Sequence, residues 1–112
     1  MFDLLTVKAQ QNLGSAVLSF TFEVPQRLQL AQVLAHADAA ITETIQVTHD
    51  ALEGAAWDTL LKTTSLTAEQ DFAWRPDGKC VFEKGDKIKI TCTDANVVAA
   101  ETISVKIQFE RL

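Results

Sequence analysis

The residues best suited to acid–base chemistry near neutral pH are the two histidines, His36 and His49. Both fall in segments that read as strands, at positions that we expect to face inward. A zinc centre needs about four ligands, and the zinc spacings CxxC and HExxH do not occur in the chain. We therefore expect two structural histidines, with no metal and no cofactor.

The two cysteines, Cys80 and Cys92, are the candidates for a nucleophile or a disulfide. A turn over residues 83–86 predicts a hairpin in which Cys80 faces Lys89, so Cys92 would lie about 10 Å further along its strand. A disulfide needs Cα atoms within about 7 Å of each other. Both cysteines share strand faces with large apolar side chains, so we expect two free, largely buried thiols without a catalytic role.

Other catalytic patterns are missing from the sequence. The nucleophile elbow GxSxG, the Walker loop and the dinucleotide-binding glycine pattern do not occur. Aspartates at the expected turns, such as Asp50, Asp77 and Asp86, match no known calcium loop, and turns use aspartate for backbone reasons alone. The sequence thus predicts a protein that is not an enzyme and has no catalytic residues.

The net charge of −5 lies entirely in the first half of the chain. Residues 1–61 hold two basic and seven acidic side chains, while residues 62–112 balance eight against eight. Nucleic-acid-binding proteins carry a strongly basic face, so we expect no nucleic-acid partner. The first residues lack the features of a secretory signal, and no apolar run reaches the ~20 residues that cross a bilayer. We expect a soluble chain that does not bind membranes.

Short strands must position these residues, because apolar and polar side chains alternate with period two along much of the chain. Ile103, Val105, Ile107 and Phe109, for example, alternate with polar residues. The expected strands are 2–9, 15–24, 27–37, 43–50, 57–65, 70–75, 79–83, 86–94 and 101–111. Residues 25–40 also carry the i, i+3, i+4, i+7 pattern of an amphipathic helix; we favour the strand and keep the helix as the alternative.

Length and composition complete the expected architecture. The 112 residues, 47% hydrophobic and 22% charged, suit one globular domain over residues 1–112. Eight or nine short strands with frequent turns predict an all-β fold, an antiparallel two-sheet sandwich of jelly-roll-like type. The order of the strands does not follow from the sequence.

The two tryptophans bear on a binding role. Trp74 shares its strand parity with Phe72, which favours a place in the core, whereas Trp57 follows two alanines near a turn and its position stays open. An exposed Trp57 or Trp74 would offer a flat face for stacking against a sugar ring. A carbohydrate-binding β-sandwich module is therefore the alternative function.

A candidate contact surface lies on the outward face of the strand 43–50. Its residues Thr44, Gln46 and Thr48 are neutral, whereas Lys87 and Lys89 protect the strand 86–94 as charged residues protect sheet edges. We expect the neutral strand to pair or pack with another protein. The alternative is that it is a central strand of its sheet.

From Glu43 to Leu112 the chain resembles small β-sandwich proteins of tailed-phage and gene-transfer-agent virions. The matching pieces are GAAWDTLL at 54–61, FAWRPDG at 72–78, GDKIKI at 85–90, and the closing strand that ends at Phe109. The resemblance implies a virion structural protein, such as a capsid decoration or head accessory protein made in the host cytoplasm. It also implies a homo-oligomer bound to itself or to a capsid shell, and it transfers no functional residues.

Overall fold

The structure is a computed structural model that describes residues 4–13, 17–92 and 102–111, so the expected strand ends at 2–3, 15–16, 93–94 and 101 lie outside the described residues. The strands are β1 (Leu4–Asn12), β2 (Leu18–Glu23), β3 (Leu28–Ile41), β4 (Thr44–Asp50), β5 (Thr59–Ser65), β6 (Glu69–Trp74), β7 (Val81–Phe82), β8 (Lys87–Cys92) and β9 (Thr102–Arg111). One 3₁₀ turn, η1 (Ala55–Trp57), is present among the described residues. All nine expected strands are present, and the helical alternative for residues 25–40 is wrong. In the described part of the chain, no helix is long and apolar enough to span a membrane.

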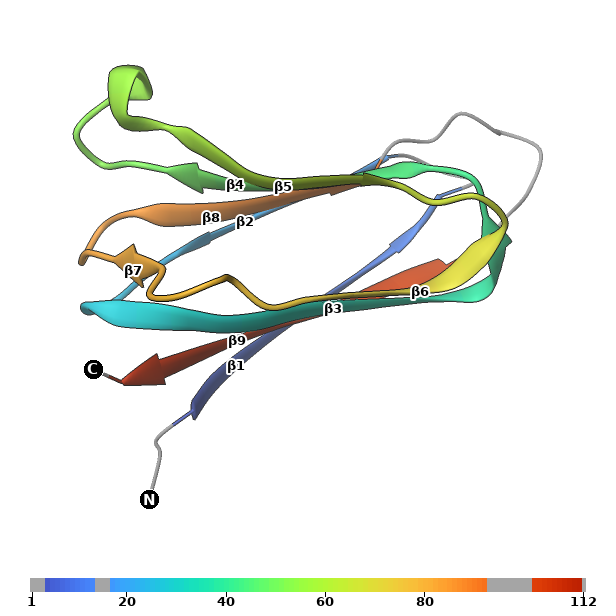
Figure 1. The fold of residues 1–112 in the computed structure, drawn as a ribbon, viewed down its shortest axis with the longest axis horizontal. Helices are drawn as coiled ribbons and strands as arrows, with labels where there is room; N and C mark the ends of the chain where they lie inside the picture. Colours follow the sequence, from blue (N-terminus) through green and yellow to red (C-terminus); the bar gives the residue numbers. More distant parts are fainter. Residues whose placement is uncertain (1–3, 14–16, 93–101, 112) are drawn as a thin grey trace.

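The strands form two antiparallel sheets that pack face to face (Figure 1). Sheet A has the order β1-β9-β3-β6, with β7 also paired to β3, and sheet B has the order β2-β8-β4-β5. Apart from the short β7, the pairs are nested: β1 with β9, β2 with β8, β3 with β6 and β4 with β5. Such a long hairpin, wound over itself into two sheets, is a jelly roll. The expected fold class is confirmed.

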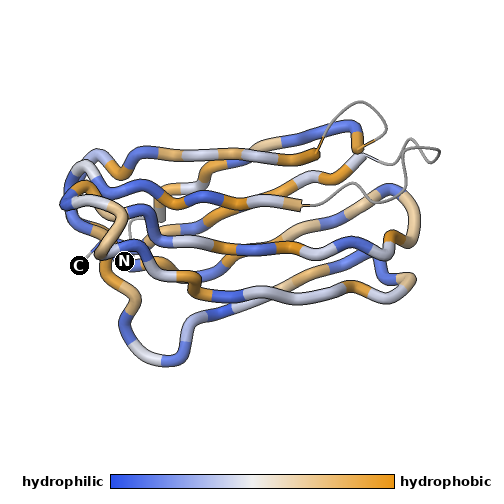
Figure 2. Tube along the Cα trace, turned by 90° about the horizontal axis from the view of Figure 1, so that it is seen from above, coloured by the Kyte–Doolittle hydropathy of each residue, from blue (hydrophilic) through white to orange (hydrophobic). Residues whose placement is uncertain are grey.

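The core fills the space between the two sheets. Ile103, Val105, Ile107 and Phe109 of β9 are all buried, while the residues between them face outward. Phe109 meets Phe82 edge-on, with ring centroids 5.6 Å apart. The same alternation of apolar and polar residues runs along most strands in Figure 2. Each fully buried side chain of this kind contributes roughly 1.5–3 kcal/mol, so the alternation itself selects the sandwich.

A β-bulge in β3 changes which side chains reach the core. Leu30 pairs with Phe109 and Gln32 pairs with Gln108, so Ala31 is an extra residue in the ladder. Because side chains alternate strictly along a strand, one extra residue reverses the faces beyond it. His36 therefore lies exposed on the outer face of sheet A, and its expected inward orientation is wrong.

The expected hairpin of residues 79–94 is also wrong. β7 pairs with the start of β3 in sheet A, whereas β8 lies in sheet B between β2 and β4. The turn between them crosses from one sheet to the other, with Gly85 at φ 92°. This is a left-handed conformation that glycine adopts readily. Both cysteines are nevertheless free thiols, Cys92 buried and Cys80 partly buried.

The sheet edges differ from those expected. β4 and β8 are interior strands, so the expectations of an unpaired edge at 43–50 and a protected edge at 86–94 are both wrong. β5 is an edge of sheet B and β1 is an edge of sheet A. Each has a lysine at its midpoint, Lys62 and Lys8. Lys62 is opposite Val47, whose side chain is buried between the two sheets, so Lys62 is on the inward face of β5.

Candidate functional site

The loop between β4 and β5, residues 51–58, is a folded structure and is called the Trp57 loop below. The backbone N–H of Gly54 donates to the carbonyl of Ala51 at 3.1 Å, and the N–H of Trp57 donates to that of Gly54 at 3.0 Å. The Ala51 N–H donates to Oδ1 of Asp58 at 2.9 Å. These bonds connect the two ends of the loop, so the tryptophan projects from a closed turn.

Asp86 fastens this loop to the turn between β7 and β8. The carboxylate is buried, with 7% of the residue exposed. Its Oδ1 accepts the N–H of Leu52 at 3.0 Å, and its Oδ2 accepts the N–H of Glu83 at 3.0 Å and Nε2 of His49 at 2.8 Å. Burial by itself raises the pKa of Asp86, but these hydrogen bonds outweigh burial and lower the pKa. The charged form thus holds the Trp57 loop in place.

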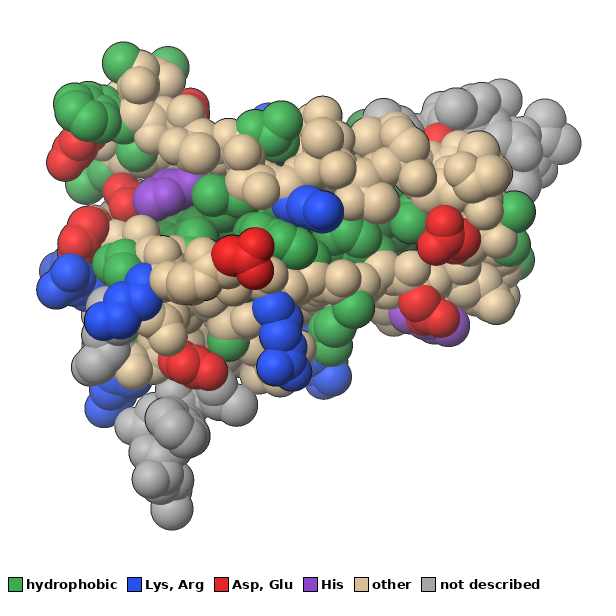
Figure 3. Space-filling view, in the orientation of Figure 1, with side chains coloured by type: hydrophobic (Ala, Val, Ile, Leu, Met, Phe, Trp, Pro, Cys, Tyr) green, Lys and Arg blue, Asp and Glu red, His purple; other side chains and the backbone are tan. Residues whose placement is uncertain are grey.

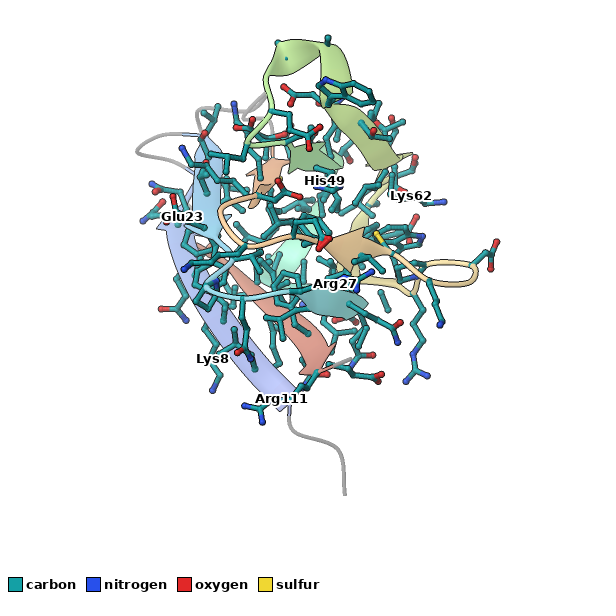
Figure 4. The ribbon with its side chains drawn as sticks, turned by 90° about the vertical axis from the view of Figure 1, so that its left-hand side faces the viewer. Lys8, Glu23, Arg27, His49, Lys62 and Arg111 are labelled. Atoms are coloured by element: carbon teal, nitrogen blue, oxygen red, sulfur yellow. The ribbon has the colours of Figure 1, made fainter. Side chains whose placement is uncertain are left out.

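His49 contacts Asp86 on one side and the buried ring of Phe82 on the other. Its ring stacks on Phe82 with centroids 4.0 Å apart and an interplanar angle of 22°. Figure 4 looks onto this end of the molecule, with His49 lying between the Trp57 loop and the body of the sandwich. The inward position expected for His49 is therefore observed, and its ring contacts Asp86 and Phe82.

Three exposed apolar side chains surround this end and are called the Trp57 patch: Leu52 (68% exposed), Trp57 (65%) and Leu60 (52%). In Figure 3 apolar side chains project at the upper left, where η1 lies in Figure 1. The fourth large apolar residue exposed within the described ranges, Val17, precedes β2. A carbon at the Cβ position of Gly85 would lie 2.8 Å from Leu52 Cδ2, so Leu52 rests on that glycine.

The candidate contact surface, Thr44, Gln46 and Thr48, adjoins the Trp57 patch. The three side chains lie on the outward face of β4, where Thr48 is directly opposite Leu60. Thr44 Oγ1 lies 3.2 Å from Ser65 Oγ on β5. Because β4 is hydrogen-bonded on both sides, this surface can offer side chains to a partner but no free backbone edge.

The two tryptophans occupy different environments. Trp74 is partly buried on β6 and packs against the core. Trp57 is exposed, next to the acidic residue Asp58. Trp57 is thus the tryptophan whose ring is available to a ligand.

Sequence reasoning did not find Leu52, Leu60 or the anchoring role of Asp86. Leucines in a polar loop were the available signal for the patch, but exposure follows only from the folded loop.

Burial raises the pKa of the Cys80 thiol. No described group of three His, Cys, Asp or Glu side chains could hold a metal ion.

No protein family model matches the sequence, and no curated protein matches it. Solved structures match it in fold. The family 32 CBM (carbohydrate-binding module) from C. perfringens NanJ, in complex with galactose, is 11% identical with a TM-score of 0.58 over 92% of this chain and 93% of that chain. PirA is 12% identical with a TM-score of 0.50 over 96% and 92% of the two chains. The Gx strain of infectious bursal disease virus gives 12% identity and a TM-score of 0.47 over 97% of this chain and 30% of that chain. At these identities the likeness establishes the β-sandwich fold alone.

Proposed function

We propose that this chain is a non-enzymatic virion structural protein, of the capsid decoration or head accessory kind, that docks on a protein shell through the Trp57 patch. The observation that carries the proposal is an exposed tryptophan on a loop that buried Asp86 holds in a fixed position. Tryptophan is enriched among the residues that dominate binding energy at protein interfaces. A loop that is already ordered loses little conformational entropy on binding.

The sequence resemblance supports the virion role, although it assigns no role to single residues. The stretch 54–61, which resembles virion sandwich proteins, contains both Trp57 and Leu60 of the patch. The neutral face of β4 continues from Leu60 through Thr48. A shell protein would therefore meet an apolar anchor beside a flat polar face, which is the usual arrangement of an interface centre and its rim.

Lysines on two of the edge strands, β5 and β1, favour contact through the sheet faces over strand pairing at those edges. A lysine that points inward at a sheet edge discourages a second strand from adding there. Lys62 occupies this position on β5, and Lys8 carries a charge at the centre of β1. Copies of the chain would accordingly be gathered by the repeating shell.

Composition of purified particles tests this proposal. Particles from the source cells, purified on a density gradient, should contain this chain at a constant ratio to the major shell protein by quantitative mass spectrometry. Particles that lack the chain would refute the virion role.

Binding of the purified protein to such particles tests the patch. Trp57→Ala should weaken binding about 30-fold, as expected for a residue worth ~2 kcal/mol at an interface. Val17→Ala removes an exposed apolar side chain elsewhere and should leave binding within about twofold. Equal losses for both variants would show that the Trp57 patch is not the anchor.

Sugar binding at Trp57 is the second candidate, and the exposed indole favours it. Galactose is the natural first probe because a similar module was solved with it. Binding by stacking should shift the tryptophan fluorescence of the parent on titration. Because both variants at position 57 lack this fluorescent ring, calorimetry measures them, and galactose binding should be kept in part by Trp57→Phe and lost in Trp57→Ala. Unchanged emission at saturating galactose in the parent protein would exclude this sugar at Trp57.

A further inference from the structure

The outer face of sheet A is hollowed into a groove of about 820 Å³, which the proposed function does not use. This volume lies in the range of roughly 300–1,000 Å³ that small-molecule sites occupy. The strand register arranges its side chains in rows that run across β1, β9, β3 and β6. The first row consists of Lys8, Lys106, Leu34 and Ala73.

The two lysines of this row are direct cross-strand partners. Like charges in such positions destabilise a sheet. Among the described residues, none of the salt bridges involves either lysine. Protection of the sheet edge accounts for Lys8 on β1, but Lys106 lies on β9, an interior strand. Figure 4 places Lys8 on the outer side of β1. An anion between the two ammonium groups would relieve their repulsion.

The second row supplies hydrogen-bonding groups: Gln10, Ser104, His36 and Asp71. Gln10 Nε2 donates to Ser104 Oγ at 2.9 Å, so the serine hydroxyl keeps its own proton for a ligand. His36 Nδ1 lies 2.6 Å from Asp71 Oδ1. Asp71 on β6 is two strands away from Ser104 on β9, a separation of about 10 Å across the sheet. The groove therefore has a cationic end and, across the sheet, an end that accepts hydrogen bonds.

We propose that this groove binds an anionic saccharide, with its carboxylate or sulfate between Lys8 and Lys106 and its hydroxyls near Ser104, His36 and Asp71. Sugar hydroxyls both donate and accept, which matches the mixed second row. Leu34 and Ala73 give the carbon face of a ring an apolar floor. The Asp71 carboxylate would repel a second anionic group, which disfavours an acidic peptide.

Two disaccharides that differ in one carboxylate test the proposal. Cellobiouronic acid, titrated into ¹⁵N-labelled protein, should shift the amide signals of Lys8, Ser104 and Lys106. Cellobiose should bind at least about tenfold more weakly, because it lacks the charge-assisted hydrogen bonds worth ~1.5–3 kcal/mol. Added sodium chloride should weaken binding of cellobiouronic acid and leave binding of cellobiose unchanged.

Variants of equal charge change locate the site. Lys106→Gln should weaken binding of the acid about tenfold. Lys89→Gln, on the outer face of sheet B, should change it less than about twofold. Native amide spectra for both variants would show that the fold is retained.

Three outcomes would overturn the proposal: no binding of the acid, shifts confined to the Trp57 loop, or equal losses in the two variants. If sodium acetate binds as tightly as the disaccharide, the groove is a site for simple anions and the saccharide proposal is wrong. These results do not depend on particle binding, so either proposal can fail alone.

Discussion

His49 Nε2 lies 2.8 Å from Asp86 Oδ2, and the pair connects strand β4 to the turn that carries the chain from sheet A to sheet B. The same carboxylate accepts the backbone N–H groups of Leu52 and Glu83. One buried side chain thus fixes the position of the Trp57 loop and the end of the sandwich beneath it.

Stability should fall in acid through Asp86. Its pKa is lowered from 3.8 in the folded state, so its contribution is present above that value and is lost as pH falls through the folded pKa. Urea unfolding of the parent between pH 7 and pH 2 should show a loss below about pH 4.

Asp86→Asn should lower the free energy of unfolding at pH 7 by about 1–3 kcal/mol, because a neutral amide has one acceptor oxygen and cannot replace the three hydrogen bonds of the carboxylate. The same variant should lose less stability than the parent as the pH falls below about 4. Asp77→Asn, at an exposed turn, is the matched control. An Asp86→Asn variant with the parent's acid profile would mean that other carboxylates cause the loss.

Phe109→Ala should lower the free energy of unfolding by about 3–5 kcal/mol. Phe109 is fully buried and contacts the rings of Phe22 and Phe82. Lys106→Ala, on the opposite face of the same strand, should cost under about 0.5 kcal/mol. Chemical denaturation measures both, and similar losses would contradict the assigned faces of β9.

Both thiols should react slowly with iodoacetamide in the native protein. Cys92 is 1% exposed, and burial raises the pKa of the Cys80 thiol, which lowers its thiolate fraction near neutral pH. We expect Cys80 to react before Cys92 and both to react fully after unfolding. Intact mass against time resolves the order, and rapid labelling of Cys92 in folded protein would contradict its burial.

Gln46→Lys combined with Thr48→Lys should leave the fold intact and reduce binding to particles. Both side chains face outward on an interior strand, and Thr48 lies opposite Lys89, so the new charges gather on one face. Ser19→Lys with Thr21→Lys adds the same charge to β2 of the same sheet. If the first pair binds as well as the parent, the β4 face is not part of the contact.

Lys62→Thr should promote self-association. The substitution removes the inward charge from the β5 edge and leaves a neutral strand that another chain can extend. Light scattering over a concentration series should show mass rising for Lys62→Thr and not for Lys89→Thr, which alters an interior strand. Equal masses for both variants would mean that Lys62 does not protect this edge.

The local pattern predicted the strands well, because burial of one face imposes period two wherever the ladder is regular. The β9 residues Ile103 to Phe109 show this directly. The prediction failed where the ladder is irregular. In β3 the bulge at Ala31 makes Leu30 and Val33 both core residues, and this spacing of three imitates a helix. A second bulge in β5, between the partners of Val47 and Thr48, has no sequence signal either.

Strand partners and surface sites lay beyond the sequence for a different reason. A turn at 83–86 suits a hairpin as well as a crossing between sheets. The choice depends on tertiary contacts, because Phe82 pairs with β3 in sheet A and stacks on His49 of sheet B. Likewise, Lys8 and Lys106 stand 98 positions apart, and their adjacency follows from the β1–β9 register.

The pairing of β1 with β9 has a consequence for synthesis. β9 lies between β1 and β3, so sheet A has a missing centre until residues 102–111 leave the ribosome. At about 5–20 residues per second the unfinished strands wait several seconds with apolar faces uncovered. Folding through such distant partners is slow, in the range of milliseconds to seconds for β topologies. Yield in the cell should therefore depend on chaperone capacity and translation rate more than on the stability of the finished protein.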